Sequence, residues 1–315
     1  MKVTRGYQGG ALRPYPTATI GNFDGHHIGH RTLLKSVVES ARKAGGTAVV
    51  LTFDPHPVKI LAPQVELRFL TSPEEKLARF EAAGIDEVVL LEFSESFARL
   101  SADAFVEQVL CRGLRLKEIF VGQHFAFGHK RAGTVTDLVA LGSRYGLVVH
   151  PVPPVMLEGG IVSSTRIRRL IQAGDVGRAA ILLGRQYAVT GIVKAGAQRG
   201  QTLGWPTANL PLPPDRVIPS DGVYAAIADV NQRRHDSVAY IGRRPTFDAG
   251  ERLLEVYVLG GAHELYGRSM TVEFIERVRG DMRFGGGEEL SRQIAADVAA
   301  AEAILRRHHE SVGTR

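Results

Sequence analysis

Residues 21–30 read Gly-Asn-Phe-Asp-Gly-His-His-Ile-Gly-His and concentrate groups that can bind phosphate. They follow a short apolar run and lead into an amphipathic stretch, which predicts a glycine-rich turn between a strand and a helix. Backbone N–H groups and the positive end of the helix dipole can hold a phosphate there. His27 and His30 stand three residues apart at the helix start and project to one side, and Gly29 lets a ligand approach the backbone. The turn has neither P-loop nor G-x-G-x-x-G spacing.

Two other interpretations of the histidine pair have to be weighed. Two imidazoles could bind a metal ion, but no cysteine or well-spaced carboxylate accompanies them as a third ligand. Each histidine could also cap a helix or pack locally, which is the commoner role of a single histidine. The glycines, the strand end and the second imidazole together favour a phosphate site.

Three further segments with unusual chemistry follow predicted strands. Residues 52–57 read Thr-Phe-Asp-Pro-His-Pro, residues 121–128 read Val-Gly-Gln-His-Phe-Ala-Phe-Gly, and residues 162–169 read Val-Ser-Ser-Thr-Arg-Ile-Arg-Arg. Taken alone, the last segment fits a serine cap followed by a basic helix face. Combined with the histidine turn, it predicts the second half of a clamp for the triphosphate of ATP.

The second half of the chain has one dense motif, residues 200–210, which read Gly-Gln-Thr-Leu-Gly-Trp-Pro-Thr-Ala-Asn-Leu. Thr207 and Asn209 stand two apart, so on an extended strand their oxygens face the same way. Paired neutral oxygens suit Mg²⁺ that carries a nucleotide phosphate, because magnesium takes few protein ligands together with phosphate oxygens and water. Without other signals, the same residues would indicate only a turn followed by a strand.

The elements that must position these groups change character along the chain. In the first half, apolar runs alternate with helical stretches, which predicts a parallel sheet covered by helices on both faces. Such sheets bind ligands at the carboxyl ends of their strands. The predicted strands are 18–22, 48–53, 87–92, 118–122 and 147–151, and the predicted helices are 31–44, 72–83, 102–111 and 136–145.

From residue 187 onward the sequence instead alternates apolar and polar residues in short segments between glycine and proline turns. This pattern predicts a small antiparallel barrel. An alanine-rich segment, residues 288–307, has apolar residues at helical spacing and predicts a closing helix. The predicted strands are 187–194, 222–229, 237–241, 253–259 and 269–278, and the predicted boundary divides the chain into domains 1–184 and 185–315.

Composition narrows the class of protein. The 315 residues are 44% hydrophobic and 23% charged, which is usual for a globular chain. No window reaches the roughly 18 apolar residues of a membrane span, no secretory signal is expected, and Cys111 alone cannot form an internal disulfide. We therefore expect a cytoplasmic protein, with a homo-oligomer left open. The net charge of +6 suits an anionic small molecule as well as nucleic acid, and because no run of five basic residues occurs, nucleic acid is the weaker alternative.

Several motifs, taken in order, resemble those of a known family. In the first half, H-x-G-H followed later by S-S-T-x-I-R resembles the nucleotidyltransferase superfamily. The motifs G-N-F-D-G-x-H-x-G-H, T-F-D-P-H-P, V-G-x-x-F-x-F-G and S-S-T-x-I-R, in that order, are similar to those of a narrower group within it. With G-x-P-T-A-N, G-V-Y-A, R-P-T-F and L-E-V-Y in the second half, the chain resembles the bacterial bifunctional FAD synthetases. The resemblance spans roughly residues 17–300. It implies a Rossmann-like α/β nucleotidyltransferase domain followed by a riboflavin kinase barrel.

The resemblance implies two ATP-dependent reactions. The kinase would phosphorylate riboflavin to FMN, with Glu255 as general base and Mg²⁺ held by Thr207 and Asn209. The other domain would transfer AMP from ATP to FMN, giving FAD and pyrophosphate, with His27 and His30 at the phosphates. The remaining implied ATP residues are Gly21, Asn22, Phe23, Asp24, Gly29, Ser164, Thr165, Arg168, Gly200, Gly204 and Pro206, and the implied flavin residues are Asp54, His56, His124, Phe125, Phe127 and Arg283.

The sequence departs from the family pattern at three places. Gln123 and His124 replace an acidic or amide pair, Gln201 stands in a phosphate loop where an arginine is common, and Arg243 precedes Arg244-Pro-Thr-Phe where a small polar residue is frequent. Two alternatives remain open: a nucleotidyltransferase for another phosphorylated small molecule, and a non-enzymatic flavin-binding regulator. The second half argues against the first, and the retained histidines and Glu255 argue against the other.

Overall fold

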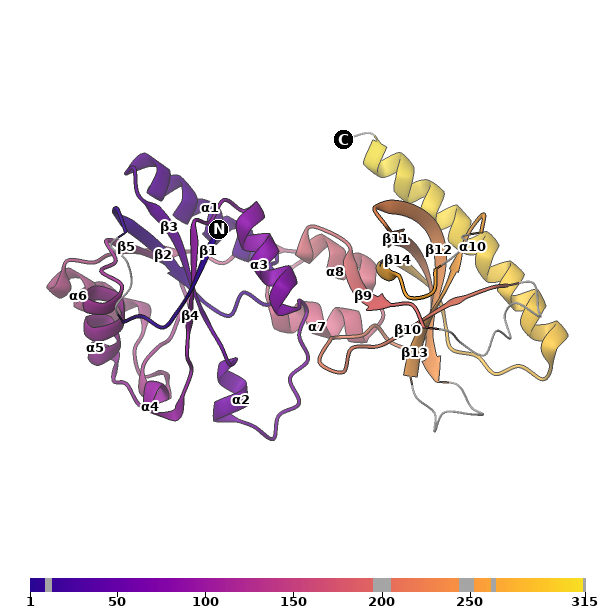
Figure 1. Ribbon diagram of the computed structural model, residues 1–315. Helices are drawn as coiled ribbons and strands as arrows, with labels where there is room; N and C mark the ends of the chain where they lie inside the picture. Colours follow the sequence, from indigo (N-terminus) through magenta and orange to yellow (C-terminus); the bar gives the residue numbers. More distant parts are fainter. Residues whose placement is uncertain (9–12, 195–204, 244–251, 262–264, 314–315) are drawn as a thin grey trace. The chain divides into compact units, whose positions relative to one another are not determined.

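The computed structural model describes residues 1–8, 13–194, 205–243, 252–261 and 265–313, and the chain forms two compact units, Met1–Ser164 and Thr165–Arg315 (Figure 1). The first unit contains a six-stranded parallel sheet in the order β1-β4-β3-β2-β5-β6. Its strands are β1 (Lys2–Arg5), β2 (Pro16–Ile20), β3 (Thr47–Phe53), β4 (Glu87–Leu91), β5 (Glu118–Gly122) and β6 (Val148–Val152). A separate hairpin pairs β7 (Met156–Leu157) with β8 (Gly160–Ile161).

Helices cover both faces of this sheet, as the alternation of strands and helices predicts (Figure 1). Leu34, Val37 and Phe80 form the core on one face, and Leu110 and Leu138 belong to the core on the other. The helices are α1 (Ile28–Lys43), α2 (Pro57–Leu61), α3 (Pro73–Ala82), α4 (Glu95–Ala98), α5 (Ala102–Ala104), η1 (Phe105–Gly113), η2 (His129–Arg131) and α6 (Val135–Tyr145).

Several elements of the first unit differ from the predictions, which include neither the hairpin of β7 and β8 nor the short helices α2, α4 and η2. The sequence does not predict the strand β1, because its four residues, Lys-Val-Thr-Arg, carry little apolar signal. In the structure, β1 lies at the edge of the sheet and pairs with β4. The helix predicted for residues 102–111 is one α-helical turn, α5, that continues as the π-helix η1. Wider turns of this kind depend on packing rather than on residue spacing alone.

The second unit is built on a six-stranded antiparallel sheet in the order β10-β13-β12-β11-β14-β9. The sheet curls into a half-barrel, and the N–H of Lys194 donates to the carbonyl of Asn209 at 2.9 Å across the seam between its first and last strands. The predicted antiparallel barrel is therefore confirmed. The strands are β9 (Tyr187–Ile192), β10 (Ala208–Pro211), β11 (Gly222–Val230), β12 (Arg233–Arg243), β13 (Arg252–Val258) and β14 (Ser269–Gly280).

Within the described residues of this unit, three helices accompany the sheet. The predicted closing helix is α10 (Gly287–Gly313), whose Ala301, Ile304 and Leu305 pack on Val223 and other side chains of one sheet face (Figure 1). Helices α7 (Ser164–Gln172) and α8 (Val176–Leu183) precede the sheet, and α8 packs against β14 and β9. Between these two helices, a Cβ at Gly174 would lie 3.0 Å from the hydroxyl of Tyr224. The sheet is thus covered both by the helix that ends the chain and by a helix that precedes its first strand.

Candidate active sites

The histidine turn of the first unit joins β2 to α1, and both imidazoles lie on one side of it. His27 caps α1: its Nδ1 accepts the N–H of His30 at 3.3 Å. The two rings stack with centroids 3.5 Å apart and planes inclined by 17°. A Cβ at Gly29 would lie 3.3 Å from the ring of His27, so this glycine leaves room for the stack. The geometry agrees with the predicted turn between strand and helix.

His30 is partly buried beside two other histidines. Burial, and then the neighbouring His27 and His26, lower the pKa of His30 well below its ordinary value of 6.5. The ring is therefore neutral at neutral pH. Within the described residues, His30 Nδ1 and Asn22 Oδ1 are buried and have no hydrogen-bond partner. Unsatisfied buried polar atoms are rare in folded proteins, and here both lie at the predicted phosphate turn.

Asp24 and Phe23 contribute to the turn through the fold. The Asp24 carboxylate accepts the N–H of Leu70 at 3.0 Å and the N–H of Thr71 at 3.1 Å, which ties the turn to the segment before α3. Phe23 is 2% exposed and packs edge-on against His30 and Phe80. Their side chains thus support the shape of the site from beneath.

The predicted triphosphate clamp meets the histidine turn at Ser164. The Ser164 hydroxyl donates to the backbone carbonyl of Asp24 at 2.8 Å, across 140 residues of sequence. Thr165 and Arg168 follow on α7, with Arg168 about one turn beyond Ser164. Gly21, also predicted at this site, donates its N–H to the carbonyl of Leu51 at the end of β3, which fixes the two neighbouring turns side by side.

The second predicted strand end supplies Asp54 and His56. His56 caps α2, since its Nδ1 accepts the N–H of Val58 at 3.2 Å. Asp54 is exposed and forms an ion pair with Arg5 of β1 at 2.9 Å. Because β3 lies beside β2 in the sheet, these residues border the histidine turn.

The third strand end, after β5, supplies the predicted aromatic pair. The rings of Phe125 and Phe127 stack with centroids 5.6 Å apart and an inclination of 9°. Phe127 is buried against Phe105, whereas His124 is exposed. Of the predicted flavin residues here, His124 and part of Phe125 are the ones open to solvent.

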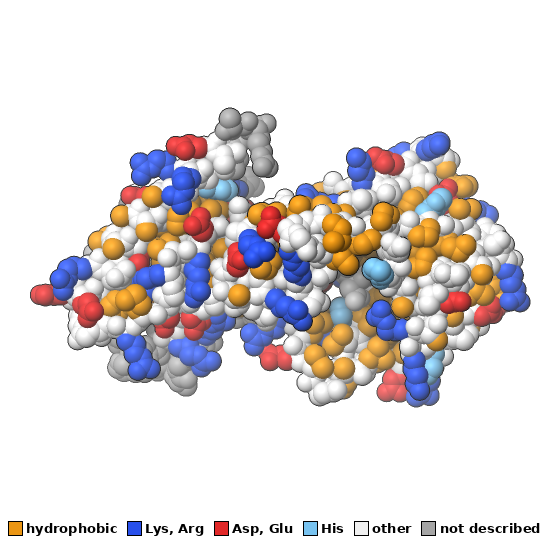
Figure 2. Space-filling model, turned by 180° about the vertical axis from the view of Figure 1, so that it is seen from behind, with side chains coloured by type: hydrophobic (Ala, Val, Ile, Leu, Met, Phe, Trp, Pro, Cys, Tyr) orange, Lys and Arg blue, Asp and Glu red, His pale blue; other side chains and the backbone are white. Residues whose placement is uncertain are grey.

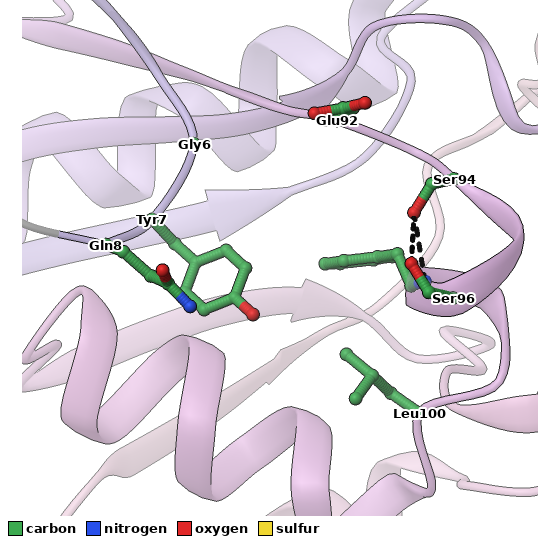
Figure 3. Close-up of a pocket in the computed structure, with 8 residues that line it drawn as sticks. Gly6, Tyr7, Gln8, Glu92, Ser94, Ser96 and Leu100 are labelled. Carbon is green, nitrogen blue, oxygen red and sulfur yellow. Dashed lines mark hydrogen bonds between the residues drawn. The ribbon is translucent and has the colours of Figure 1, made fainter.

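Sequence reasoning missed two features at this edge of the sheet. One is Lys76 of α3, whose Nζ lies 3.5 Å from Thr52 Oγ1, although its segment is otherwise recognisable only as a helix start. The other is a pocket of about 400 Å³ at the carboxyl ends of β1 and β4 (Figure 3). It contains none of the predicted site residues and is lined by Gly6, Tyr7, Gln8, Glu92, Ser94, Ser96, Phe97 and Leu100.

In the second unit, the predicted kinase residues converge on two neighbouring strands. Asn209 of β10 and Glu255 of β13 are paired in register, and the hydroxyl of Thr207 donates to Glu255 Oε2 at 3.4 Å. Leu254 and Val256 are fully buried on the opposite face of β13, while Glu255 is half-buried. This confirms the predicted alternation along the strand.

A tyrosine of the neighbouring strand lies beside Glu255. Tyr240 of β12 pairs in register with Glu255 and donates its hydroxyl to Asp281 at 3.0 Å. Burial, followed by the hydrogen bond to Asp281, raises the pKa of Tyr240, so the phenol stays protonated. Pro206 precedes Thr207 and Arg283 is exposed beyond β14, whereas Gly200, Gly204 and the departing residue Gln201 lie outside the described residues.

A divalent cation fits the oxygens gathered here. The Thr207 hydroxyl and the Asn209 side-chain carbonyl, beside the Glu255 carboxylate, are hard oxygen ligands of the kind that Mg²⁺ prefers. In the part of the chain that the structure describes, no group of three or more His, Cys, Asp or Glu side chains could hold a metal ion. A metal at this site would therefore depend on neutral oxygens and on phosphate oxygens from a nucleotide.

Comparison with known proteins identifies both halves. A family model for FAD synthetase matches residues 14–166, and one for riboflavin kinase matches residues 183–305. The bifunctional riboflavin kinase/FMN adenylyltransferase of Escherichia coli K12 is 37% identical over 305 residues, covering 96% of this chain and 97% of that protein. This chain belongs to the bifunctional riboflavin kinase/FMN adenylyltransferase family.

Other members of the family agree. The bifunctional riboflavin kinase/FMN adenylyltransferases of Pseudomonas fluorescens and Bacillus subtilis are 38% and 34% identical, over 96% and 88% of this chain and 98% and 89% of those proteins. A solved Streptococcus pneumoniae chain titled a macrolide-efflux protein is 31% identical with a TM-score of 0.88, covering 96% of this chain and 99% of that one. Among the described residues of this family member, no helix is long and apolar enough to span a membrane.

Proposed function

We propose that this chain converts riboflavin to FMN and then FMN to FAD, using one ATP in each step. The observation that carries the proposal is that one chain holds both a histidine turn with unsatisfied buried polar atoms and a cross-strand Asn209–Glu255 pair. Each arrangement suits one of the reactions named in the curated relatives. We assign residues 1–184 to the adenylyltransferase and residues 185–315 to the kinase, whereas the two compact units divide between Ser164 and Thr165.

In the kinase reaction, Glu255 accepts the proton of the ribityl 5′-hydroxyl as the oxygen attacks the γ-phosphorus of ATP. Thr207 and Asn209 hold Mg²⁺, which would neutralise charge on the ATP phosphates. The register pairing of Asn209 with Glu255 supports this division, because it brings base and metal ligand to one place. We assign ATP binding to Pro206 and, outside the described residues, to Gly200 and Gly204, and we assign flavin binding to Arg283.

In the adenylyltransferase reaction, an oxygen of the FMN phosphate attacks the α-phosphorus of ATP and pyrophosphate leaves. FMN is already a nucleophile, so alignment and charge stabilisation suffice and no covalent enzyme intermediate is needed. His27 and His30 contact the ATP phosphates, and Ser164, Thr165 and Arg168 bind the leaving pyrophosphate. The turn from Gly21 to Asp24 shapes the nucleotide site, and Gly29 gives access to its backbone. The flavin side comprises Asp54, His56, His124, Phe125 and Phe127.

The distribution of basic side chains and the net charge of the chain are consistent with small anionic substrates. On the face shown in Figure 2, basic side chains lie in small groups among acidic and apolar ones, which suits small anionic ligands better than a polynucleotide. The net charge of +6 then accommodates two triphosphates and a flavin phosphate. Because both reactions consume ATP, we place the protein in the cytoplasm.

The test is to incubate the purified protein with riboflavin, ATP and Mg²⁺ and to separate the flavins by chromatography. We expect FMN to form first and FAD to follow, with both requiring ATP. A parallel incubation that starts from FMN isolates the second step. If neither FMN nor FAD appears, the proposed function is wrong. If supplied FMN is not adenylylated while another phosphorylated small molecule is, the first unit is a nucleotidyltransferase of different specificity.

A further inference from the structure

Lys76 lies between the two turns that the proposed adenylyl transfer uses. It stands in the first turns of α3 and is half-buried, and its Nζ reaches the hydroxyl of Thr52 at 3.5 Å. Thr52 is the last residue but one of β3 and is fully buried. Because Ile20 of β2 pairs in register with Leu51 of β3, Thr52 adjoins the start of the histidine turn. The ammonium is thus placed where the ends of β2 and β3 meet.

Three separate anchors hold α3 in this position. The backbone N–H groups of Leu70 and Thr71, just before the helix, donate to the Asp24 carboxylate of the histidine turn. Ser72 and Glu75 then form a reciprocal capping box that fixes the first turn. One turn beyond Lys76, Phe80 packs edge-on against Phe23 and His26 of the same histidine turn. Since positions four apart share a helix face, this face of α3 is directed toward the turn.

No carboxylate of the described residues lies within ion-pair distance of the Lys76 ammonium. Burial lowers the pKa of this lysine, and the more distant carboxylates of Asp24 and Asp54 oppose that effect. Asp24 is engaged by backbone N–H groups, and Asp54 forms its ion pair with Arg5 at 2.9 Å. Within the described residues Lys76 itself forms no ion pair, and its contact with Thr52 satisfies at most one of three N–H donors. A half-buried cation with spare donors is a site for an anion.

We propose that Lys76 is a further catalytic residue of the first unit, which binds the FMN phosphate and draws it against the α-phosphate of ATP. This inference rests on the proposed function. One oxygen of the FMN phosphate forms a bond to the α-phosphorus, the bond from that phosphorus to the oxygen bridging to the β-phosphorus breaks, and pyrophosphate carries the electrons away. Lys76 keeps its proton throughout and offsets the repulsion between the two approaching anions.

The experiment compares Lys76→Met, which removes the charge at similar length, with Lys76→Arg, which keeps it. For Lys76→Met we expect kcat/KM for FMN to fall on the order of 100-fold or more at saturating ATP, because one preorganised charge contact is removed. We expect KM for ATP to change less than about threefold and riboflavin phosphorylation, measured on the same molecules, to stay within about twofold of wild type. Lys76→Arg should recover a substantial part of the lost activity. The matched control is Lys35→Met, which removes an exposed lysine of α1.

Several outcomes would overturn the proposal. The first is a Lys76→Met variant that adenylylates FMN at a wild-type rate. The second is a raised KM for ATP with an unchanged KM for FMN, which would assign the cation to ATP. If Lys76→Met unfolds the first unit, Lys76→Arg and Lys76→Gln are compared at equal folded fraction, and equal activity of these two would show that the charge is not used. Wild-type protein that forms no FAD would contradict the proposed function instead.

Discussion

In the parallel sheet of the first unit, the candidate catalytic groups stand on turns beyond the strand ends, whereas in the second unit they stand on or next to paired strands. Asn209 and Glu255 are placed by the register of β10 and β13, so the ladder itself sets their separation. His27 and His30 have no such ladder. Their turn is instead fixed by Asp24, Ser164 and the stacked rings. A site on turns therefore depends on contacts from several separate segments, whereas the register of two paired strands places the groups of the other site.

The largest expected effect tests the strand-built site. Glu255→Gln keeps the shape of the side chain and an oxygen that can accept from Thr207, but removes the proposed base. We expect riboflavin phosphorylation to fall on the order of 10²- to 10⁴-fold, while supplied FMN is still adenylylated. Steady-state rates of both reactions, measured by flavin chromatography, check this. Glu276→Gln, an exposed strand glutamate in the same sheet, is the control, and loss of both activities in Glu255→Gln would contradict the separation of the two sites.

The second largest expected effect tests the site on the histidine turn, where FAD formation should be lost while FMN formation is retained. His30→Gln removes an imidazole whose Nδ1 is buried without a partner among the described residues. We expect FAD formation to fall on the order of 10²- to 10³-fold, as for the loss of one contact to developing charge, while FMN accumulates. The same chromatographic assay separates the two products. His150→Gln, at a histidine bonded to Glu118 at 3.0 Å, should leave both rates close to wild type.

A third prediction concerns the anchors. Asp24→Asn replaces a carboxylate that accepts several N–H and O–H donors by a group with a single acceptor oxygen. We expect the first unit to lose about 1–3 kcal/mol of unfolding free energy, with the kinase unit unaffected. Urea unfolding followed through each activity separately measures this. Asp103→Asn, an exposed carboxylate near Arg144, should cost less than about 1 kcal/mol, and equal costs at the two positions would argue against a special anchoring role for Asp24.

The smallest effect is a pH dependence. Since the folded-state pKa of His30 lies below 6.5, the unfolded chain binds a proton below that pH that the folded chain does not. Stability of the first unit should therefore decline as pH falls below about 6.5, by at most about 1.4 kcal/mol per pH unit from this group. Denaturation between pH 7.5 and 5 checks the slope. His30→Gln should reduce the dependence of the unfolding free energy on pH. An unchanged slope would show that another group takes up the proton on unfolding.

The sequence predicts structural features that depend on residues close together along the chain, such as the start of a helix or the alternation of a strand. Helix α3 begins within one residue of its predicted start at residue 72, and β13 alternates in burial as the pattern of apolar and polar residues predicts. What the sequence could not supply are contacts between distant segments. Lys76 becomes a candidate for anion binding only when the fold brings it beside Thr52 and the histidine turn. Asp24 can anchor that turn only because the segment at Leu70 lies next to it. Neither contact leaves a periodic signal.

The helix α8 has a consequence for how the two activities could be separated by truncation. Residues 167–182 lie outside both family models, yet α8 and all of α7 beyond Ser164 belong to the second compact unit, and Leu182 and Leu183 are buried. A fragment beginning at residue 185 would lack α8 and expose the parts of β9 and β14 that this helix covers. Because exposed apolar surface promotes aggregation, we expect such a fragment to aggregate. A fragment beginning at Thr165 would keep that cover. We therefore expect a folded second unit to need about twenty residues before the segment that the riboflavin kinase family model matches.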